Sequence, residues 1–266
     1  MINLDMRDTF FKEIYTIAKK DKNLFVVSVD YGAPMLDHIR NDLPKQFINA
    51  GISEQNAVSL SAGMANDKKK VVLYSINSFL VFRALEQLKL DISYNNNPIT
   101  IVTVGSGFAY GVAGPTHHSI EDVSILNSIS GINLYSPSDS NTVKFLSHKV
   151  LNNKRTNYMR LERGLLRKFP FTKKDYDNGY RSIKKGKDII FIGYGINVER
   201  IFQIEKHMMQ KTQRNIKFEI LDLFRLKPLN IKLLCKKIRK FKYAFILEEQ
   251  IETGGISSYL AKILLE

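Results

Sequence analysis

Residues Asn49–Gln55 read NAGISEQ, at the point where a short apolar run gives way to a helical pattern. Residues 46–49 are predicted to form a strand and residues 54–66 a helix. The helix body, AVSLSAGMA, is uncharged and rich in small residues, so we expect it to be buried against other helices. Glu54 would then be an acid in the first turn of a buried helix. Attraction to the helix dipole alone also explains an acid at this position.

The same change from strand to helix repeats along the whole chain. Such alternation is typical of a largely parallel sheet covered by helices, and it predicts an α/β fold. In the first part of the chain, strands are expected at 24–29, 46–49, 70–76, 99–104, 132–136 and 157–161. Helices are expected at 7–20, 54–66, 80–94, 120–128 and 141–151.

The pattern lapses after Arg163 and then resumes. Residues 166–187 mix charge, proline and glycine without apolar periodicity, which predicts a linker. The second unit has expected strands at 188–193, 218–221 and 243–247, and expected helices at 198–211, 231–240 and 256–265. We therefore predict two domains, 1–165 and 188–266, each a mostly parallel sheet flanked by helices.

Composition narrows the class of protein. The 266 residues are 44% hydrophobic, as in soluble globular proteins, and the formal net charge is +14. The lysines are spread along the chain rather than gathered beside aromatic residues, so we expect no nucleic-acid partner, whereas anionic substrates such as sugar phosphates suit the charge.

Two further features concern the compartment. The single Cys235 excludes an intrachain disulfide and fits a reducing environment. No apolar run approaches the roughly 20 residues of a membrane span, and the beginning of the sequence does not resemble a signal peptide. We expect a cytoplasmic protein without a membrane partner.

A glycine-rich segment is the second unusual feature. Residues 105–118 read GSGFAYGVAGPTHH. Glycines let a backbone approach a ligand closely, and a loop of this length in a compact domain is usually functional. The adjacent His117 and His118 point in different directions, and no cysteine or acid spacing here resembles a zinc site, so no metal site is expected. A structural loop with exposed histidines is the alternative.

Together, these motifs closely resemble the C-terminal half of transketolases, and more particularly the separately encoded C-terminal subunit of split transketolases. The segments that carry the resemblance in the first domain are NAGISEQN, YSINSFLVFRALEQLKLDISYNN, GFAYGVAGPTHHSIED, SPSD and MRLERG. In the second domain they are GKDIIFIGYG, LDLFRLKPLN and LEEQIETGGISS, which are similar to the C-terminal domain of the family in order and spacing. The resemblance implies a pyrimidine-binding domain at 1–165 and a transketolase C-terminal domain at 188–266.

The resemblance implies thiamine diphosphate as cofactor and assigns residues to it. Glu54 would hydrogen-bond the pyrimidine ring nitrogen, so that the exocyclic nitrogen of the cofactor can remove the thiazolium proton. Phe79 matches the aromatic residue that stacks on the pyrimidine, and Asp30 matches an aspartate near the thiazolium ring. Arg83 matches an arginine of the split-subunit pattern. A core position for Phe79 and a surface ion pair for Arg83 remain the alternatives.

Three residues would face the substrate. His117 matches the histidine that contacts the reacting oxygens, where it can stabilise charge and relay protons. Arg163 matches the arginine that binds the substrate phosphate, a task that suits a bidentate guanidinium. His118 is assigned to the substrate as well, although relatives vary there. Ala113 stands where single-chain transketolases carry an acid, so the donor and acceptor sugars stay open.

The resemblance also implies a partner. The sequence contains no GDG followed by Asn, the motif that binds Mg²⁺ (or Ca²⁺) and diphosphate in the other half of transketolase. We therefore expect an N-terminal subunit to hold the metal and the diphosphate, in an α2β2 assembly. The C-terminal domain, ending at Glu266, is expected to be short.

Three alternatives stay open. The beta subunit of a 2-oxoacid dehydrogenase shares the G-I-x-E-Q glutamate, but its histidine loop normally reads H-S-Q-S-P-E. A 1-deoxyxylulose-5-phosphate synthase also has GPTH, but it carries the acid that is missing at Ala113. A non-catalytic binding module would have had no reason to keep Glu54, Phe79, His117 and Arg163 together.

Overall fold

The computed structural model describes residues 5–211 and 216–265, which form two sheets with helices on both faces. The first sheet has the strand order β10-β5-β6-β4-β3-β1-β2. Its strands are β1 (Leu24–Ser28), β2 (Phe47–Asn49), β3 (Lys70–Ile76), β4 (Thr100–Val104), β5 (Ile132–Tyr135), β6 (Thr156–Leu161) and β10 (Arg225–Lys227). All pairs are parallel except β10 with β5.

The second sheet has the order β11-β8-β9-β7. Its strands are β7 (Arg181–Lys184), β8 (Ile189–Gly193), β9 (Phe218–Asp222) and β11 (Tyr243–Leu247). Only β7 runs antiparallel to its neighbour, β9. The predicted fold class, two mostly parallel sheets flanked by helices, is confirmed.

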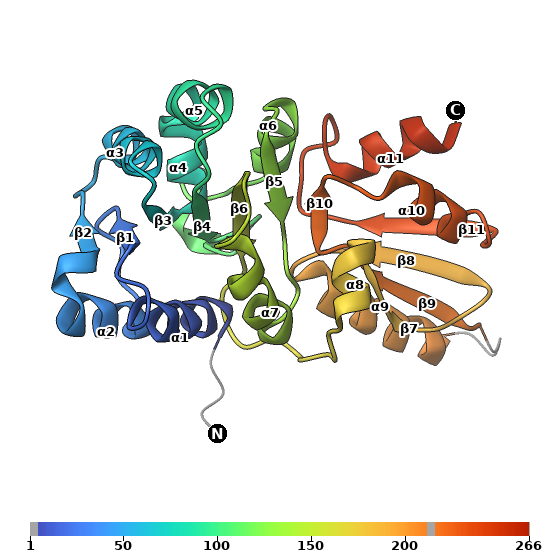
Figure 1. The fold of residues 1–266 in the computed structure, drawn as a ribbon. Helices are drawn as coiled ribbons and strands as arrows, with labels where there is room; N and C mark the ends of the chain where they lie inside the picture. Colours follow the sequence, from blue (N-terminus) through green and yellow to red (C-terminus); the bar gives the residue numbers. More distant parts are fainter. Residues whose placement is uncertain (1–4, 212–215, 266) are drawn as a thin grey trace.

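Helices cover both faces of each sheet (Figure 1). On one face of the first sheet lie α1 (Met6–Ala18), α2 (Pro34–Asp42), with the turn η1 (Pro44–Gln46), and α7 (Ser140–Val150). On the other face lie α3 (Glu54–Asn66), α4 (Asn77–Arg83), α5 (Leu85–Gln87), the π-helical segment η2 (Leu88–Tyr94) and α6 (Asp122–Ser128). The second sheet is flanked by α9 (Asn197–Lys211) on one side and by α10 (Ile231–Ile238) and α11 (Ile256–Leu265) on the other.

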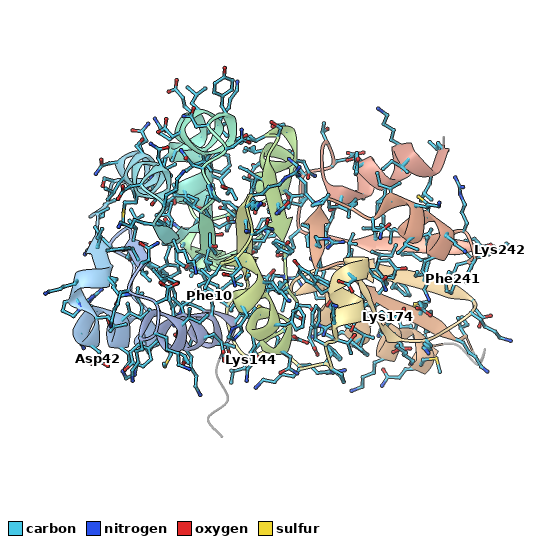
Figure 2. The ribbon with its side chains drawn as sticks, in the orientation of Figure 1. Phe10, Asp42, Lys144, Lys174, Phe241 and Lys242 are labelled. Carbon is cyan, nitrogen blue, oxygen red and sulfur yellow. The ribbon has the colours of Figure 1, made fainter. Side chains whose placement is uncertain are left out.

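Apolar burial explains why these layers form. Every residue of β4, TIVTV, is buried, as expected for a central strand with helices on both faces. Helix α1 buries one face, and its start is capped by the Asp5 carboxylate, which accepts a hydrogen bond from the backbone N–H of Asp8 at 2.8 Å. Figure 2 shows Phe10 of this helix inside the first domain, whereas Lys144 lies at the surface.

The two domains are held together by a shared strand and by buried polar contacts, as well as by the chain that links them. Strand β10 follows β9 in sequence, yet it pairs with β5 of the first sheet. Beside this crossover, the buried Arg181 of β7 donates to Asp222 of β9 and, at 2.8 Å, to Asp139, the residue that caps α7 of the first domain. Burial raises the pKa of Asp222 to about 6, against the opposing effect of Arg181.

Several elements differ from the sequence-based expectation. The expected linker, residues 166–187, contains α8 (Lys173–Asn178) and β7, because Thr172 and Asp175 form a capping box and Gly179 ends the helix with a positive φ of 82°. The single helix expected at 80–94 is divided into α4, α5 and η2.

Helix α2 and strand β10 were not expected either. Helix α2 buries only Leu36 and Ile39, and β10 is three residues long, so neither gives a clear apolar period in the sequence. Among the described residues, no helix has the length and apolar character needed to cross a membrane.

We predict that Arg181→Ala strongly destabilises the chain, because the substitution leaves two buried carboxylates without their cation. The free energy of unfolding should fall by about 3–5 kcal/mol. The exposed Arg155 provides the matched control, and Arg155→Ala should change it by less than about 0.5 kcal/mol. Urea unfolding of both variants measures the effect, and equal stabilities would contradict the role given to Arg181.

Candidate active site

The residues singled out in the sequence gather at one edge of the first sheet. Asp30 follows β1, and Phe79 and Arg83 lie on the helix that follows β3. Residues 105–118, here called the histidine loop, follow β4, and Arg163 follows β6. These strands are parallel, so their carboxyl ends meet at the same edge, where ligands bind in open α/β sheets.

Glu54, Arg83 and Phe79 form one group. Glu54 begins α3 and is 5% exposed. Nη1 of Arg83 donates to Oε1 of Glu54 at 2.7 Å, and the same guanidinium lies 4.0 Å from the centre of the Phe79 ring. Within the described residues, no hydrogen bond engages the second carboxyl oxygen, Oε2. The carboxyl group is thus oriented on one side and available to a ligand on the other.

The two adjacent histidines differ in their surroundings. The ring of His117 meets Phe79 edge-on at 4.8 Å, and its Nδ1 lies 3.0 Å from the Thr116 hydroxyl. His118 instead contacts its own loop, with Nε2 2.9 Å from the Gly111 carbonyl oxygen and its ring 5.0 Å from that of Phe108. The structure therefore groups His117, but not His118, with Phe79.

Tyr110 is a site residue that the sequence analysis missed. Its ring lies 5.4 Å from that of His117 and 4.6 Å from the Arg163 guanidinium. Its hydroxyl pairs with that of Tyr31 at 2.8 Å, and burial raises its pKa well above the ordinary value for tyrosine. A Cβ at Gly105, where φ is 92°, would lie 2.0 Å from the Tyr110 ring, so this glycine makes room for it.

Asp30 reaches the group through its neighbour in sequence. It is exposed, has a positive φ of 50°, and exchanges hydrogen bonds of 3.2 Å with the side chain of Asn49. The Asn49 side chain also accepts from the Gly51 backbone at 3.0 Å, which shapes the turn before Glu54. Tyr31, the next residue, meets Tyr110, so Asp30 is connected to the group through the backbone rather than by its own side chain.

A buried asparagine ties the two halves of this arrangement together. Asn77, at the start of α4, is 0% exposed, and its amide nitrogen donates to Ser119 at 2.8 Å and to Asp122 at 2.6 Å. The next residue, Ser78, donates to the Thr116 carbonyl at 3.0 Å. The helix that carries Phe79 is thereby attached to both sides of His117. In the sequence, the only sign of this role is that Asn77 is a polar residue directly after the buried strand β3.

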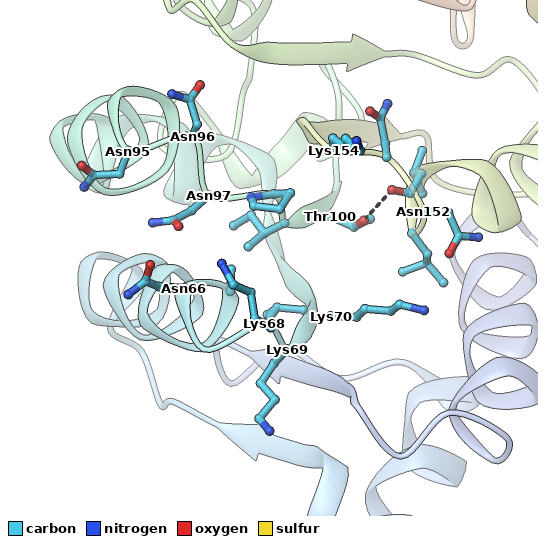
Figure 3. A pocket seen from close by; sticks show the side chains of 17 residues that line it. Asn66, Lys68, Lys69, Lys70, Asn95, Asn96, Asn97, Thr100, Asn152 and Lys154 are labelled. Atoms are coloured by element: carbon cyan, nitrogen blue, oxygen red, sulfur yellow. Dashed lines mark hydrogen bonds between the residues drawn. The ribbon is translucent and has the colours of Figure 1, made fainter.

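A separate hollow of about 460 Å³ lies near the opposite, amino edge of the sheet (Figure 3). Lysines and asparagines dominate its lining, namely Lys68, Lys69, Lys70, Lys154, Asn66, Asn95, Asn96, Asn97, Asn152 and Asn153. Three helical segments, α3, η2 and α7, end here, and lysines at helix C-termini complement the negative end of the dipole. None of the predicted site residues lines this hollow.

The described residues contain no cluster of three histidines, cysteines or acids able to hold a metal ion.

Glu162 is a buried acid beside the exposed Arg163, where the two domains meet. Burial raises its pKa to about 7; Arg160 and the Ile196 N–H oppose the shift, and Glu249 and Asp122 add to it. Its carboxylate packs so closely on the second domain that a Cβ at Gly195 would lie 2.1 Å from Oε1.

Comparison with known proteins identifies two matching family models. Residues 3–168 match "Transketolase, pyrimidine binding domain", and residues 179–266 match "Transketolase, C-terminal domain". The second match includes β7, in agreement with its place in the second sheet.

Individual relatives cover nearly the whole chain. One subunit of the apulose-4-phosphate transketolase of Phocaeicola vulgatus is 29% identical over 98% of this chain and 83% of that protein. The 1-deoxy-D-xylulose-5-phosphate synthase of Halothermothrix orenii is 27% identical over 99% of this chain, which spans only 41% of that enzyme. A solved structure described as a split gene transketolase, inactive beta4 tetramer, superposes with a TM-score of 0.86 at 22% identity, covering 99% of this chain and 86% of that one.

The raised pKa of Glu162 predicts a pH-dependent stability. Glutamate titrates near pH 4.3 in an unfolded chain, so the folded state binds an extra proton between about pH 4 and 7, and stability falls as the pH rises through that window. Glu162→Gln removes the titrating carboxyl group. The stability of this variant relative to wild type should therefore rise by on the order of 3 kcal/mol between pH 5 and pH 8. Urea unfolding at both values measures it; an unchanged difference would refute the prediction.

Proposed function

The chain belongs to the transketolase family, and from that premise we propose that it is the C-terminal subunit of a split, thiamine-diphosphate-dependent transketolase. Its reaction would transfer a two-carbon ketol unit from a ketose phosphate, or a related sugar, to an aldose. The observation that carries the proposal is the continuous contact from Glu54 through Arg83 and Phe79 to His117.

The residues at this edge fit a bound aminopyrimidine. Phe79 is partly exposed and offers an aromatic surface, while the oriented carboxyl of Glu54 leaves Oε2 available to a ring nitrogen. Asp30 contributes a second carboxylate at the same edge. When bound, thiamine diphosphate would supply the nucleophilic carbon and the electron sink that carbon–carbon bond cleavage needs.

The remaining residues suit a sugar phosphate. His117 lies between Phe79 and Tyr110, where its ring can exchange a proton with a substrate hydroxyl. Arg163 is exposed and stacked on Tyr110, so its planar donors are held facing solvent and can bind a phosphate in bidentate fashion. We propose that His118 stabilises the histidine loop through its contact with Gly111, and that it reaches substrate only at the edge of the site.

A second, different chain completes the proposed site. The relative from Phocaeicola vulgatus is named as one subunit of its transketolase, and the similar solved structure is an inactive assembly of beta chains. We propose that an N-terminal subunit supplies the diphosphate-binding domain with Mg²⁺ (or Ca²⁺), giving a cytoplasmic α2β2 enzyme with its sites between subunits.

Substitution of Glu54 tests its assignment to the cofactor. Glu54→Gln keeps the size of the side chain but removes the acid, so kcat for ketol transfer by the two-subunit complex should fall at least about 100-fold. The exposed Glu252 provides the control, and Glu252→Gln should leave kcat unchanged. Unaltered activity of Glu54→Gln would refute the assignment.

Assays of the chain alone and with a partner test whether a second subunit is required. The purified chain should not transfer ketol units from a ketose phosphate, whereas activity should appear on titration with a subunit that carries the GDG motif. Product analysis distinguishes ketol transfer from oxoacid decarboxylation, which the alternative of a 2-oxoacid dehydrogenase predicts. Ketol transfer by the chain alone, with thiamine diphosphate and magnesium, would overturn the proposal of a split site.

A further inference from the structure

The loop that carries both histidines is closed at a narrow neck. Gly107 and Ser119 form an isolated antiparallel bridge, with backbone hydrogen bonds of 3.0 and 2.9 Å in the two directions. Residues 108–118 lie between these two positions, so the placement of His117 depends on how the neck is held.

The second domain contacts this neck with three consecutive residues, Glu249–Ile251, which follow β11. Oε2 of Glu249 accepts from the Phe108 backbone N–H at 3.2 Å, on one side of the neck. The Ile251 N–H donates to the Ile120 carbonyl at 2.9 Å, on the other side. The same short segment thus holds both strands of the neck.

Gln250, between these two, reaches the polar group under the loop. Its amide nitrogen donates to Oδ1 of Asp122 at 2.9 Å, and its Oε1 accepts from the Val123 N–H at 3.2 Å. The other oxygen of Asp122 accepts from Asn77, which also holds Ser119. One carboxylate therefore joins the second domain to the helix that carries Phe79.

Gly107 lets Glu249 approach the neck closely. A Cβ at Gly107 would lie 2.0 Å from Oε2 of Glu249, so only glycine permits this approach. On its far side, Oε1 of Glu249 pairs with Arg200 of α9 at 2.5 Å, which fixes the carboxylate against the second domain.

We propose that Glu249 and Gln250 are positioning residues, through which the second domain sets the histidine loop for the sugar substrate. The second domain would then act on the substrate half of the site without touching substrate. The helix that carries Phe79 would keep the other hydrogen bonds of Asn77, and Glu54 and Phe79 would keep their contacts with Arg83. The kinetic part of this inference rests on the proposed function; the structural part does not.

Hydrogen exchange in the full chain tests the structural part. Glu249→Ala and Gln250→Leu should speed exchange of the amides in 105–120 by about tenfold. Glu249 accepts from the Phe108 N–H, and the Gln250 amide nitrogen donates to the Ser119 carbonyl at 3.4 Å, so each variant removes a hydrogen bond to the neck. Glu249→Gln keeps an acceptor and should restore slow exchange, and the exposed Glu252→Ala should resemble wild type. Unchanged exchange at the neck, or faster exchange spread over β3 and α3 as well, would overturn the proposal.

Steady-state kinetics of the two-subunit complex test the consequence. Glu249→Ala and Gln250→Leu should raise KM for the ketose donor about tenfold or more, with the dissociation constant of thiamine diphosphate unchanged. Rescue by Glu249→Gln is expected. A loss of cofactor affinity equal to the loss in kcat/KM would contradict a role confined to the loop. An inactive wild-type complex would refute the proposed function, while the exchange experiment would still decide on the neck.

Discussion

The four hydrogen bonds of Asn77 are the constraint on which the site depends. The buried amide donates to Ser119 and Asp122 and accepts from Thr103 and Tyr158, at distances between 2.6 and 2.8 Å. A buried amide with unmade hydrogen bonds is costly, so one arrangement of its partners is strongly preferred. Those partners belong to β4, β6, the end of the histidine loop and the start of α6, and Asn77 itself begins the helix of Phe79. The proposed cofactor side and the proposed substrate side are therefore placed relative to each other by one side chain.

The second domain belongs to the same construction. One apolar cluster contains buried side chains from both domains, among them Leu134 and Tyr158 from the first and Tyr194 and Leu223 from the second. Strand β10 extends the first sheet, and polar contacts at Arg181 and at Gln250 join the domains at separate places. This construction gives a physical reason for both domains to occur in one chain, since the loop that carries His117 is held from both.

Much of this was predictable from the sequence, and the omissions share a cause. Apolar runs in the sequence predict buried strands such as β3 and β4. Motifs single out four of the candidate site residues, namely Glu54, Phe79, His117 and Arg163. Three contacts join residues far apart in sequence, so no local pattern reveals them. They are the pairing of Arg83 with Glu54, the stacking of Arg163 on Tyr110 and the hydrogen bond from Gln250 to Asp122. The sequence predicts a linker where α8 and β7 lie, because these short elements depend on capping and on one buried arginine rather than on apolar periodicity.

We propose that Glu54 and Phe79 form the pyrimidine half of a thiamine diphosphate site, and that a second subunit completes this site. A crystal structure of the two-subunit complex with thiamine diphosphate, magnesium and a ketose phosphate tests it most directly. We expect the pyrimidine ring to lie on Phe79, with a ring nitrogen in hydrogen-bond contact with Glu54. The sugar should lie beside His117, and the diphosphate should be bound by the partner. A cofactor bound away from Glu54, or held entirely within one chain, would contradict it.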